Sequence, residues 1–319
     1  MTKPRVIVTR RWPHEVEARL ATEFSVTLNE ADRPFGQKEL REALLEADAV
    51  LPTVTDRLGA DLFEGGVRAK ILGNFGVGFN HIDIEAARLG GLVVTNTPAV
   101  LTDATADLAM TLLLMCARRA GEGEREVRTG GWAGWRPTHL CGTQVTGKTI
   151  GIIGMGRIGQ AMARRCHFGF GMDVVFFDSY PVADPGMRAR QLATVEDVLA
   201  AADFVSLHCP GGGENYNLIN QQRLACMKPS AFLINTARGD VVDEEALVQA
   251  LDEGVLAGAG LDVFKTEPAV PTTLTGRQDV VLLPHLGSAT SETRVAMGMR
   301  VIDNLLAFFD GRRPPDAVN

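Results

Sequence analysis

The hexapeptide Gly154-Met155-Gly156-Arg157-Ile158-Gly159 has the glycine spacing of a phosphate-binding turn. It follows an apolar run at 149–153 and precedes a helical pattern at 160–165. The first glycine permits a tight turn, the second lets the backbone approach a pyrophosphate, and the third lets helix and strand pack closely. Free N–H groups and the helix dipole then hold the anion. The context favours a dinucleotide site over a strand–helix turn that binds nothing.

Asp178 bears on the choice of dinucleotide. It lies at the end of the next apolar run, 173–177, where a carboxylate can bind the 2′ and 3′ hydroxyls of an adenine ribose. A carboxylate also repels a 2′-phosphate, and the adjacent Ser179 and Tyr180 supply no guanidinium to hold one. The sequence therefore predicts NAD as the favoured cofactor, with NADP as a possible alternative.

Three later segments each place a polar or charged residue after an apolar run. They are INTARG at 234–239, LDVF at 261–264 leading to Glu267-Pro268, and LPHLGSAT at 283–290. Ligands of open α/β sheets bind at the carboxyl ends of the strands. Each residue alone has a plainer interpretation, such as a surface ion pair for the arginine, a loop histidine, or a glutamate in a turn. Their occurrence together favours a common site.

These segments, in this order after GMGRIG, resemble the D-isomer-specific 2-hydroxyacid dehydrogenases. The likeness covers nearly the whole chain and includes GNFGVGFNHID at 73–83, NTPAVLTDATADLA at 96–109 and GKTIGIIGMGRIG at 147–159. Within this family the segment at 131–160, GWAGWRPTHLCGTQVTGKTIGIIGMGRIGQ, is most similar to the glyoxylate/hydroxypyruvate reductases.

The resemblance implies a catalytic set of Arg238, Glu267 and His285. Reduction of a 2-oxo acid requires a hydride on the carbonyl carbon and a proton on its oxygen. An imidazole such as His285 can exchange that proton at neutral pH, and a neighbouring Glu267 would favour the imidazolium and orient the ring. Arg238 can hold the substrate carboxylate and polarise the carbonyl, because a guanidinium suits planar anions.

The resemblance implies further contacts in the two kinds of binding site. The loop GNFGVGFN at 73–80 would donate backbone N–H groups to the same carboxylate, although a simple glycine-rich turn is the alternative. The expected substrate-binding residues are Asn74, Val77 and Gly78, with Arg238 and His285. The expected cofactor-binding residues are Gly154, Gly156, Arg157, Ile158, Gly159, Asp178, Cys209, Pro210, Thr236, Ala237, Asp262, Gly287 and Ser288.

Short β-rich runs alternate with helical patterns in both halves of the chain, which predicts parallel sheets covered by helices. We therefore expect an α/β protein with two doubly wound sheets, Rossmann-like or flavodoxin-like. One long helix is expected at 103–128, interrupted at Gly121 and Gly123, and an irregular segment follows it. The resemblance implies a substrate domain of 1–98 plus 290–319, a cofactor domain of 99–289, and an active site in the cleft between them.

Composition excludes several other functions. The chain of 319 residues has a net charge of −7 and 45% hydrophobic residues, so nothing favours nucleic acid or a membrane as partner. Its five cysteines are scattered and form no CxxC pair, which argues against disulfides and a metal site. No apolar run is long enough for a signal peptide or a membrane span. We expect a cytoplasmic protein.

The sequence thus predicts an enzyme that reduces glyoxylate or hydroxypyruvate to glycolate or D-glycerate. Two alternatives are another D-2-hydroxyacid dehydrogenase, of the D-lactate or 3-phosphoglycerate type, and an NAD-sensing binding protein of the same fold without activity. The loop at 73–80 contains no Lys or Arg to hold a phosphate, which disfavours the 3-phosphoglycerate type. A homodimer is expected through 103–146, where an apolar helix precedes Trp132 and Trp135.

Overall fold

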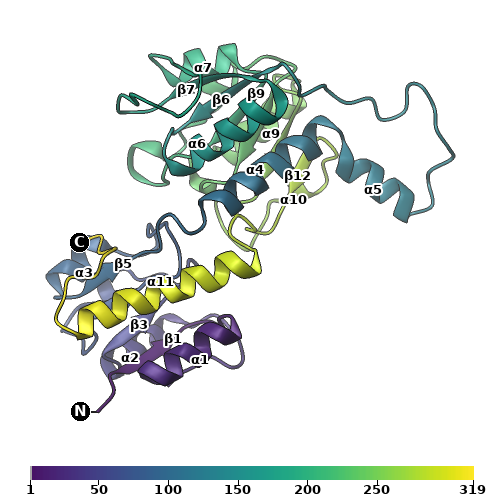
Figure 1. Ribbon diagram of the computed structural model, residues 1–319. Helices are drawn as coiled ribbons and strands as arrows, with labels where there is room; N and C mark the ends of the chain where they lie inside the picture. Colours follow the sequence, from purple (N-terminus) through teal and green to yellow (C-terminus); the bar gives the residue numbers. More distant parts are fainter. Residues whose placement is uncertain (1) are drawn as a thin grey trace. The chain divides into compact units, whose positions relative to one another are not determined.

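The computed structural model describes residues 2–319, which form two compact units (Figure 1). The smaller unit consists of the chain up to Leu101 together with Ser288–Asn319, and the larger unit is Thr102–Gly287. Among the residues described, no helix is long and apolar enough to cross a membrane.

The smaller unit contains a sheet of five parallel strands in the order β2-β1-β3-β4-β5. The strands are β1 (Arg5–Val8), β2 (Ser25–Thr27), β3 (Ala49–Leu51), β4 (Ile71–Gly73) and β5 (Val93–Thr95). The helices are α1 (His14–Glu23), α2 (Gln37–Glu46), α3 (Ile84–Leu89), α11 (Ser291–Phe309) and the short 3₁₀ helix η1 (Ala60–Leu62). This strand order is that of flavodoxin-like sheets, which confirms the predicted fold class for this unit.

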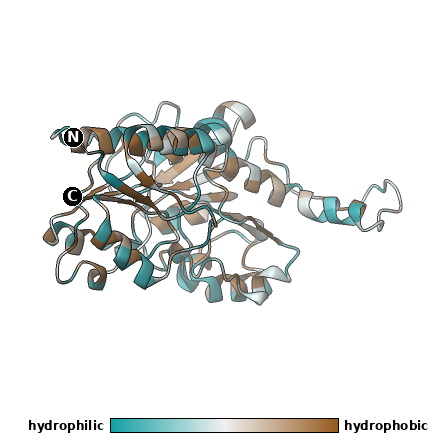
Figure 2. Ribbon diagram, turned by 90° about the horizontal axis from the view of Figure 1, so that it is seen from below, coloured by the Kyte–Doolittle hydropathy of each residue, from teal (hydrophilic) through white to brown (hydrophobic). Residues whose placement is uncertain are grey.

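The inner strands of this sheet are buried, whereas β2 at its edge is not. All residues of β3 and β4 are buried, and the strand ribbons in Figure 2 are mainly hydrophobic. Runs of this kind are typical of parallel strands covered on both sides by helices. At the end of β4, a Cβ on Gly73 would lie 2.6 Å from Val301 and 2.8 Å from Leu51, so a glycine is needed where α11 packs on the sheet.

The larger unit contains seven parallel strands in the order β12-β11-β10-β9-β6-β7-β8. They are β6 (Thr149–Ile153), β7 (Asp173–Phe177), β8 (Arg190–Gln191), β9 (Phe204–Leu207), β10 (Phe232–Asn235), β11 (Gly258–Leu261) and β12 (Val280–Leu282). The chain winds outward from β6 in one direction through β7 and β8, and in the other direction from β9 onward. The gap between β6 and β9 is therefore the topological switch point, where ligands of doubly wound sheets bind.

Helices with side-chain caps connect several of these strands. The elements are α4 (Thr102–Ala117), α5 (Ala120–Arg128), α6 (Arg157–Arg164), the π-helical turn η2 (Arg165–Gly169), α7 (Val195–Ala201), η3 (Gly213–Asn215), α8 (Gln221–Leu224), η4 (Gly239–Val241), α9 (Glu244–Asp252) and α10 (Thr272–Thr275). Thr194 accepts a hydrogen bond from the N–H of Asp197 at the start of α7, and Asp243 caps α9 in the same way.

For the helix expected at 103–128, the predicted position of the interruption is wrong. The break lies at Arg119, whose φ of 51° is left-handed and separates α4 from α5, whereas Gly121 and Gly123 lie inside α5. The guanidinium of Arg119 pairs with Glu122 in the first turn of α5. A glycine within a helix costs about 1 kcal/mol relative to alanine, too little to end it. After α5 the chain is irregular as far as β6, as expected.

Candidate active site

The glycine-rich turn joins β6 to α6 at the switch point of the larger sheet. Gly154 has a φ of 91°, and a Cβ there would lie 2.7 Å from the backbone nitrogen of Cys209. A Cβ on Gly159 would lie 2.1 Å from the carbonyl oxygen of Gly154. At Gly156, by contrast, a Cβ would meet no heavy atom within 4 Å. Packing therefore requires the first and third glycines, while the second leaves open space that a dinucleotide phosphate can use.

Asp178 follows β7 and lies beside this turn. Its Oδ2 accepts a hydrogen bond of 2.8 Å from the N–H of Met155, and its Oδ1 accepts one of 3.1 Å from the N–H of Tyr180. These two bonds hold a carboxylate next to the glycine-rich turn. At the start of α6, the side chain of Arg157 is exposed and that of Ile158 is partly buried.

Two further turns end at the same edge of the sheet. Cys209 and Pro210 come just after β9, and Thr236 and Ala237 come directly after β10. Burial raises the pKa of the Cys209 thiol to about 11, so this cysteine is a thiol at neutral pH. The Oγ1 atom of Thr236 is buried and has no hydrogen-bond partner within residues 2–319. The unpartnered hydroxyl and the space at Gly156 both fit a bound dinucleotide.

Asn235 is a functional residue that the sequence analysis did not assign. Its Oδ1 accepts a hydrogen bond of 3.0 Å from the N–H of Ala237, and its Nδ2 donates one of 2.9 Å to the carbonyl of Arg238. An asparagine that brackets the following residues in this way is typical of turns. Asn235 therefore fixes the turn that presents Arg238, and its position at a strand end was the available signal.

His285 and Glu267 form a hydrogen-bonded pair. The distance between Nδ1 of His285 and Oε2 of Glu267 is 2.8 Å, and the N–H of Phe264 donates to the other carboxylate oxygen at 3.0 Å. His285 has a left-handed φ of 55°, and its backbone N–H donates to the carbonyl of Asp262 at 2.9 Å. Because the carboxylate binds Nδ1, this ring nitrogen carries a proton and Nε2 is left to exchange one with a substrate.

Asp262 holds the turn that contains His285. Its side chain is completely buried, and its two oxygens accept hydrogen bonds from the N–H groups of Leu286 at 2.7 Å and Gly287 at 2.8 Å. Burial raises the pKa of Asp262 to about 6. Ser288 follows this turn, and its carbonyl accepts a hydrogen bond from Thr290. Asp262 was expected to contact the cofactor. In the structure both of its carboxylate oxygens accept hydrogen bonds from backbone N–H groups.

Arg238 adds a cation to the electrostatics of this edge. Burial lowers the pKa of Arg238, while the charges of Glu267 and Asp240 act in the opposite direction. Burial by itself would raise the pKa of Glu267, but the hydrogen bond and charge of His285, the Phe264 N–H and Arg238 together lower it. Glu267 is therefore an anion at neutral pH, hydrogen-bonded to the imidazole and close enough to the Arg238 guanidinium to feel its charge. Together these groups can bind an anion and transfer a proton.

In the smaller unit, the loop at 73–80 is fixed by its own asparagine. The Asn74 side chain is fully buried and donates to the carbonyls of Gly76 at 3.1 Å and Gly78 at 3.0 Å. Its oxygen is 3.1 Å from Nε2 of His81. The backbone N–H groups of Val77 and Gly78 have no partner among the residues that the structure describes. Asn74 thus shapes the loop, and two neighbouring backbone donors remain for an anion.

A glycine-rich turn at the switch point of a doubly wound sheet, with an arginine and a His–Glu pair at the same edge, defines a nicotinamide-dependent oxidoreductase. The family model of the D-isomer specific 2-hydroxyacid dehydrogenase NAD binding domain matches residues 110–287. The chain belongs to this family, as its motifs predicted, and it is an NAD(P)-dependent dehydrogenase.

Relatives match along the full length of the chain. The glyoxylate reductase of Thermococcus litoralis is 44% identical over 323 residues, which cover 99% of this chain and 97% of the relative. That of Pyrococcus furiosus is 44% identical over 325 residues, with 99% and 96% covered. Among solved structures, the NADPH-dependent glyoxylate/hydroxypyruvate reductase of Sinorhizobium meliloti with NADP and malonate has a TM-score of 0.89 at 35% identity, covering 99% of this chain and 97% of that chain.

Proposed function

We propose that this protein reduces glyoxylate or hydroxypyruvate to glycolate or D-glycerate, with NADH as the favoured reductant. The observation that carries the proposal is the contact of 2.8 Å between His285 and Glu267, on the same strand edge as Arg238. The glyoxylate reductases that match over the whole chain support this choice among 2-oxo acids.

The residues have distinct roles in the proposed reaction. A nicotinamide cofactor, when bound, would supply the hydride for the carbonyl carbon. His285, as an imidazolium, donates the Nε2 proton to the carbonyl oxygen, so that the ketone or aldehyde becomes an alcohol and the ring becomes neutral. Glu267 stabilises the imidazolium and orients it through Nδ1. Arg238 binds the substrate carboxylate and polarises the carbonyl.

The loop at 73–80 supports a small substrate. The N–H groups of Val77 and Gly78, which have no hydrogen-bond partner within residues 2–319, can bind one carboxylate. It carries no Lys or Arg for a phosphate group, which disfavours 3-phosphohydroxypyruvate. Glyoxylate, hydroxypyruvate and pyruvate satisfy both conditions, and the glyoxylate reductases among the relatives favour the first two.

Asp178 supports a preference for NADH over NADPH. Its carboxylate is held beside the glycine-rich turn by two backbone N–H groups, where it would accept the ribose hydroxyls and repel a 2′-phosphate. The reductase of Sinorhizobium meliloti uses NADPH, so the preference is a property to test in this chain and cannot be transferred from its relatives.

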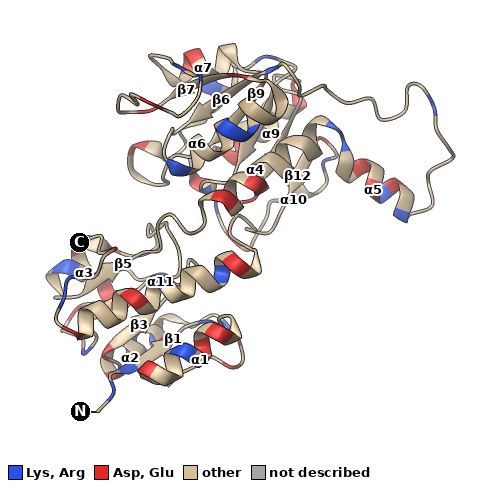
Figure 3. Ribbon diagram, in the orientation of Figure 1, with Lys and Arg blue, Asp and Glu red and all other residues tan. Residues whose placement is uncertain are grey.

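We also propose that the protein is a homodimer. The arm, residues 119–147, contains α5, which has no buried residue, and carries charges of both signs along that helix (Figure 3). Trp132 is 54% exposed and Trp135 is 82% exposed, although both are large apolar side chains. Aromatic side chains are enriched at interfaces, so the arm suits contact with a second copy.

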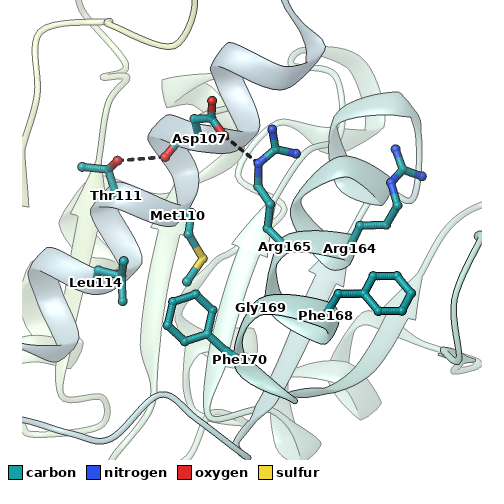
Figure 4. A pocket seen from close by; sticks show the side chains of 9 residues that line it. All are labelled: Asp107, Met110, Thr111, Leu114, Arg164, Arg165, Phe168, Gly169 and Phe170. Carbon is teal, nitrogen blue, oxygen red and sulfur yellow. Dashed lines mark hydrogen bonds and ion pairs between the residues drawn. The ribbon is translucent and has the colours of Figure 1, made fainter.

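A pocket in the same unit could receive apolar side chains of the second copy. It has a volume of about 620 Å³ and lies between α4 and the η2 turn (Figure 4). Its apolar lining comes from Met110, Leu114, Phe168 and Phe170, and Phe168 is 70% exposed.

We further propose that the protein is cytoplasmic. All five cysteines are unpaired, which fits a reducing compartment.

A steady-state panel tests the proposed reaction. Oxidation of NADH and NADPH would be followed with glyoxylate, hydroxypyruvate, pyruvate and 3-phosphohydroxypyruvate. We expect the highest kcat/KM with glyoxylate or hydroxypyruvate and NADH. A higher kcat/KM with pyruvate or with 3-phosphohydroxypyruvate would assign the protein to another type of D-2-hydroxyacid dehydrogenase.

A further inference from the structure

Three consecutive carbonyl groups of the loop at 73–80, those of Gly76, Val77 and Gly78, accept hydrogen bonds from the protein. Gly76 accepts hydrogen bonds from the N–H of Thr97 at 3.1 Å and from the Asn74 amide at 3.1 Å. Gly78 accepts from the same amide. The carbonyl of Val77 accepts a bond of 2.8 Å from the side-chain amide of Asn96.

These contacts determine where the loop's backbone donors point. In a planar trans peptide, the C=O of one residue and the N–H of the next point in opposite directions. Because the carbonyls of Gly76 and Val77 face Asn74, Asn96 and Thr97, the N–H groups of Val77 and Gly78 point away from them. Two adjacent N–H groups with one orientation form an anion-binding concavity.

Asn96 is itself held by the C-terminal segment. Its backbone N–H donates to the carbonyl of Asp316 at 3.2 Å, and its side chain is only 9% exposed. Asp316 is also buried, and its carboxylate receives two hydrogen bonds from Arg300, at 2.6 and 2.8 Å, and one from Asn304 at 3.0 Å. Both partners belong to α11. The end of the chain therefore anchors the residue that holds the Val77 peptide.

We propose that Asn96 is a positioning residue for binding of the substrate carboxylate, and that Asp316 keeps Asn96 in place. This inference rests on the proposed function, in which the N–H groups of Val77 and Gly78 bind that carboxylate. The loop has no cationic side chain, so its affinity for an anion depends on the orientation of these two donors. Loss of the Asn96 amide frees the Val77 peptide to rotate, which turns the Gly78 N–H away.

The test compares Asn96→Asp with a matched buried asparagine. Asn96→Asp keeps the side-chain shape but places an acceptor against the Val77 carbonyl. We expect the KM for glyoxylate and the dissociation constant for oxalate, measured by calorimetry with NADH present, to rise about tenfold or more. The KM for NADH should change less than about twofold, since the larger unit is untouched. Asp316→Asn should change the same constants in the same direction, by a smaller factor.

Asn29→Asp is the control, because the Asn29 amide also donates to two backbone carbonyls, Thr9 and Arg33, at 2.7 Å each, but does not contact the loop. A folded Asn96→Asp enzyme with unchanged KM and oxalate affinity would overturn the inference, as would an equal rise in Asn29→Asp. If Asn96→Asp fails to fold by circular dichroism, Asn96→Ala is judged by the same criteria. A wild-type enzyme that prefers another 2-oxo acid would contradict the proposed function instead, and the comparison would then use that acid.

Discussion

Nδ1 of His285 lies 2.8 Å from Oε2 of Glu267, and the backbone holds both partners in place. The N–H of Phe264 fixes the carboxylate, and the carbonyl of Asp262 accepts the N–H of His285. The ring therefore has one nitrogen committed to the protein and one available for proton transfer.

His285→Ala should reduce kcat for glyoxylate by about 10²- to 10⁴-fold, the usual contribution of a positioned general acid. The dissociation constant for NADH, measured by fluorescence titration, should stay close to the wild-type value. His14→Ala, at an exposed histidine on α1, is the control and should keep full activity. A loss of less than about fivefold in His285→Ala would remove His285 from the role of acid.

Glu267→Gln should lower kcat for glyoxylate by about tenfold or more. The pKa of Glu267 is lowered, so the wild-type enzyme keeps an anion hydrogen-bonded to the His285 ring at neutral pH. The amide keeps the shape of the side chain but removes the charge that orients and stabilises the proton donor. The KM for NADH should stay within about twofold of the wild-type value. A folded Glu267→Gln enzyme with wild-type kcat would show that Glu267 does not act on His285.

Asp178→Ala combined with Ser179→Arg should shift the cofactor preference towards NADPH. The change removes a repulsive carboxylate and adds a guanidinium that can bind a 2′-phosphate. The measurement is the ratio of kcat/KM with NADPH to that with NADH, and Asp184→Ala, at another acid in the segment after β7, serves as the control. If the wild-type enzyme already prefers NADPH, the role assigned to Asp178 is incorrect.

Sedimentation at micromolar concentration should give a dimer of the 34.3 kDa chain. Trp135 is 82% exposed in the single chain and would be buried in the proposed interface. Trp135→Asp should weaken the dimer, because a charged side chain would then have to be buried there. Leu89→Asp, at a side chain that is 73% exposed on α3, should leave the dimer intact. A fully active wild-type monomer would exclude the proposed assembly.

Several buried strands were predictable from the sequence because they are short, mainly apolar runs. The apolar runs expected at 149–153 and 173–177 coincide with β6 and β7. The strand β8 was not predicted, since its two residues, Arg190 and Gln191, are exposed at the sheet edge and carry no apolar pattern. Break positions in helices were also difficult to predict, because Arg119 adopts the left-handed conformation although it is not a glycine.

The site residues divide in the same way. The catalytic set was predictable because Arg238, Glu267 and His285 follow strands within motifs of the D-isomer-specific 2-hydroxyacid dehydrogenases. In the structure, His285 and Glu267 are in contact. Asn96 and Asp316 did not stand out as a pair, since the first follows β5 and the second lies near the end of the chain. Their contact arises only when the C-terminal segment pairs with β5, through the bridge between Thr95 and Ala317.

Product analysis tests the central claim most directly. Hydroxypyruvate would be reduced in two separate reactions. In each, the NADH would carry one deuterium at C4 of the nicotinamide, on one face of the ring in the first reaction and on the other face in the second. The product would be resolved by chiral chromatography and mass spectrometry. We predict D-glycerate with one deuterium at C2 from one epimer and none from the other. L-glycerate, or product without deuterium from both epimers, would contradict direct hydride transfer by a D-2-hydroxyacid dehydrogenase.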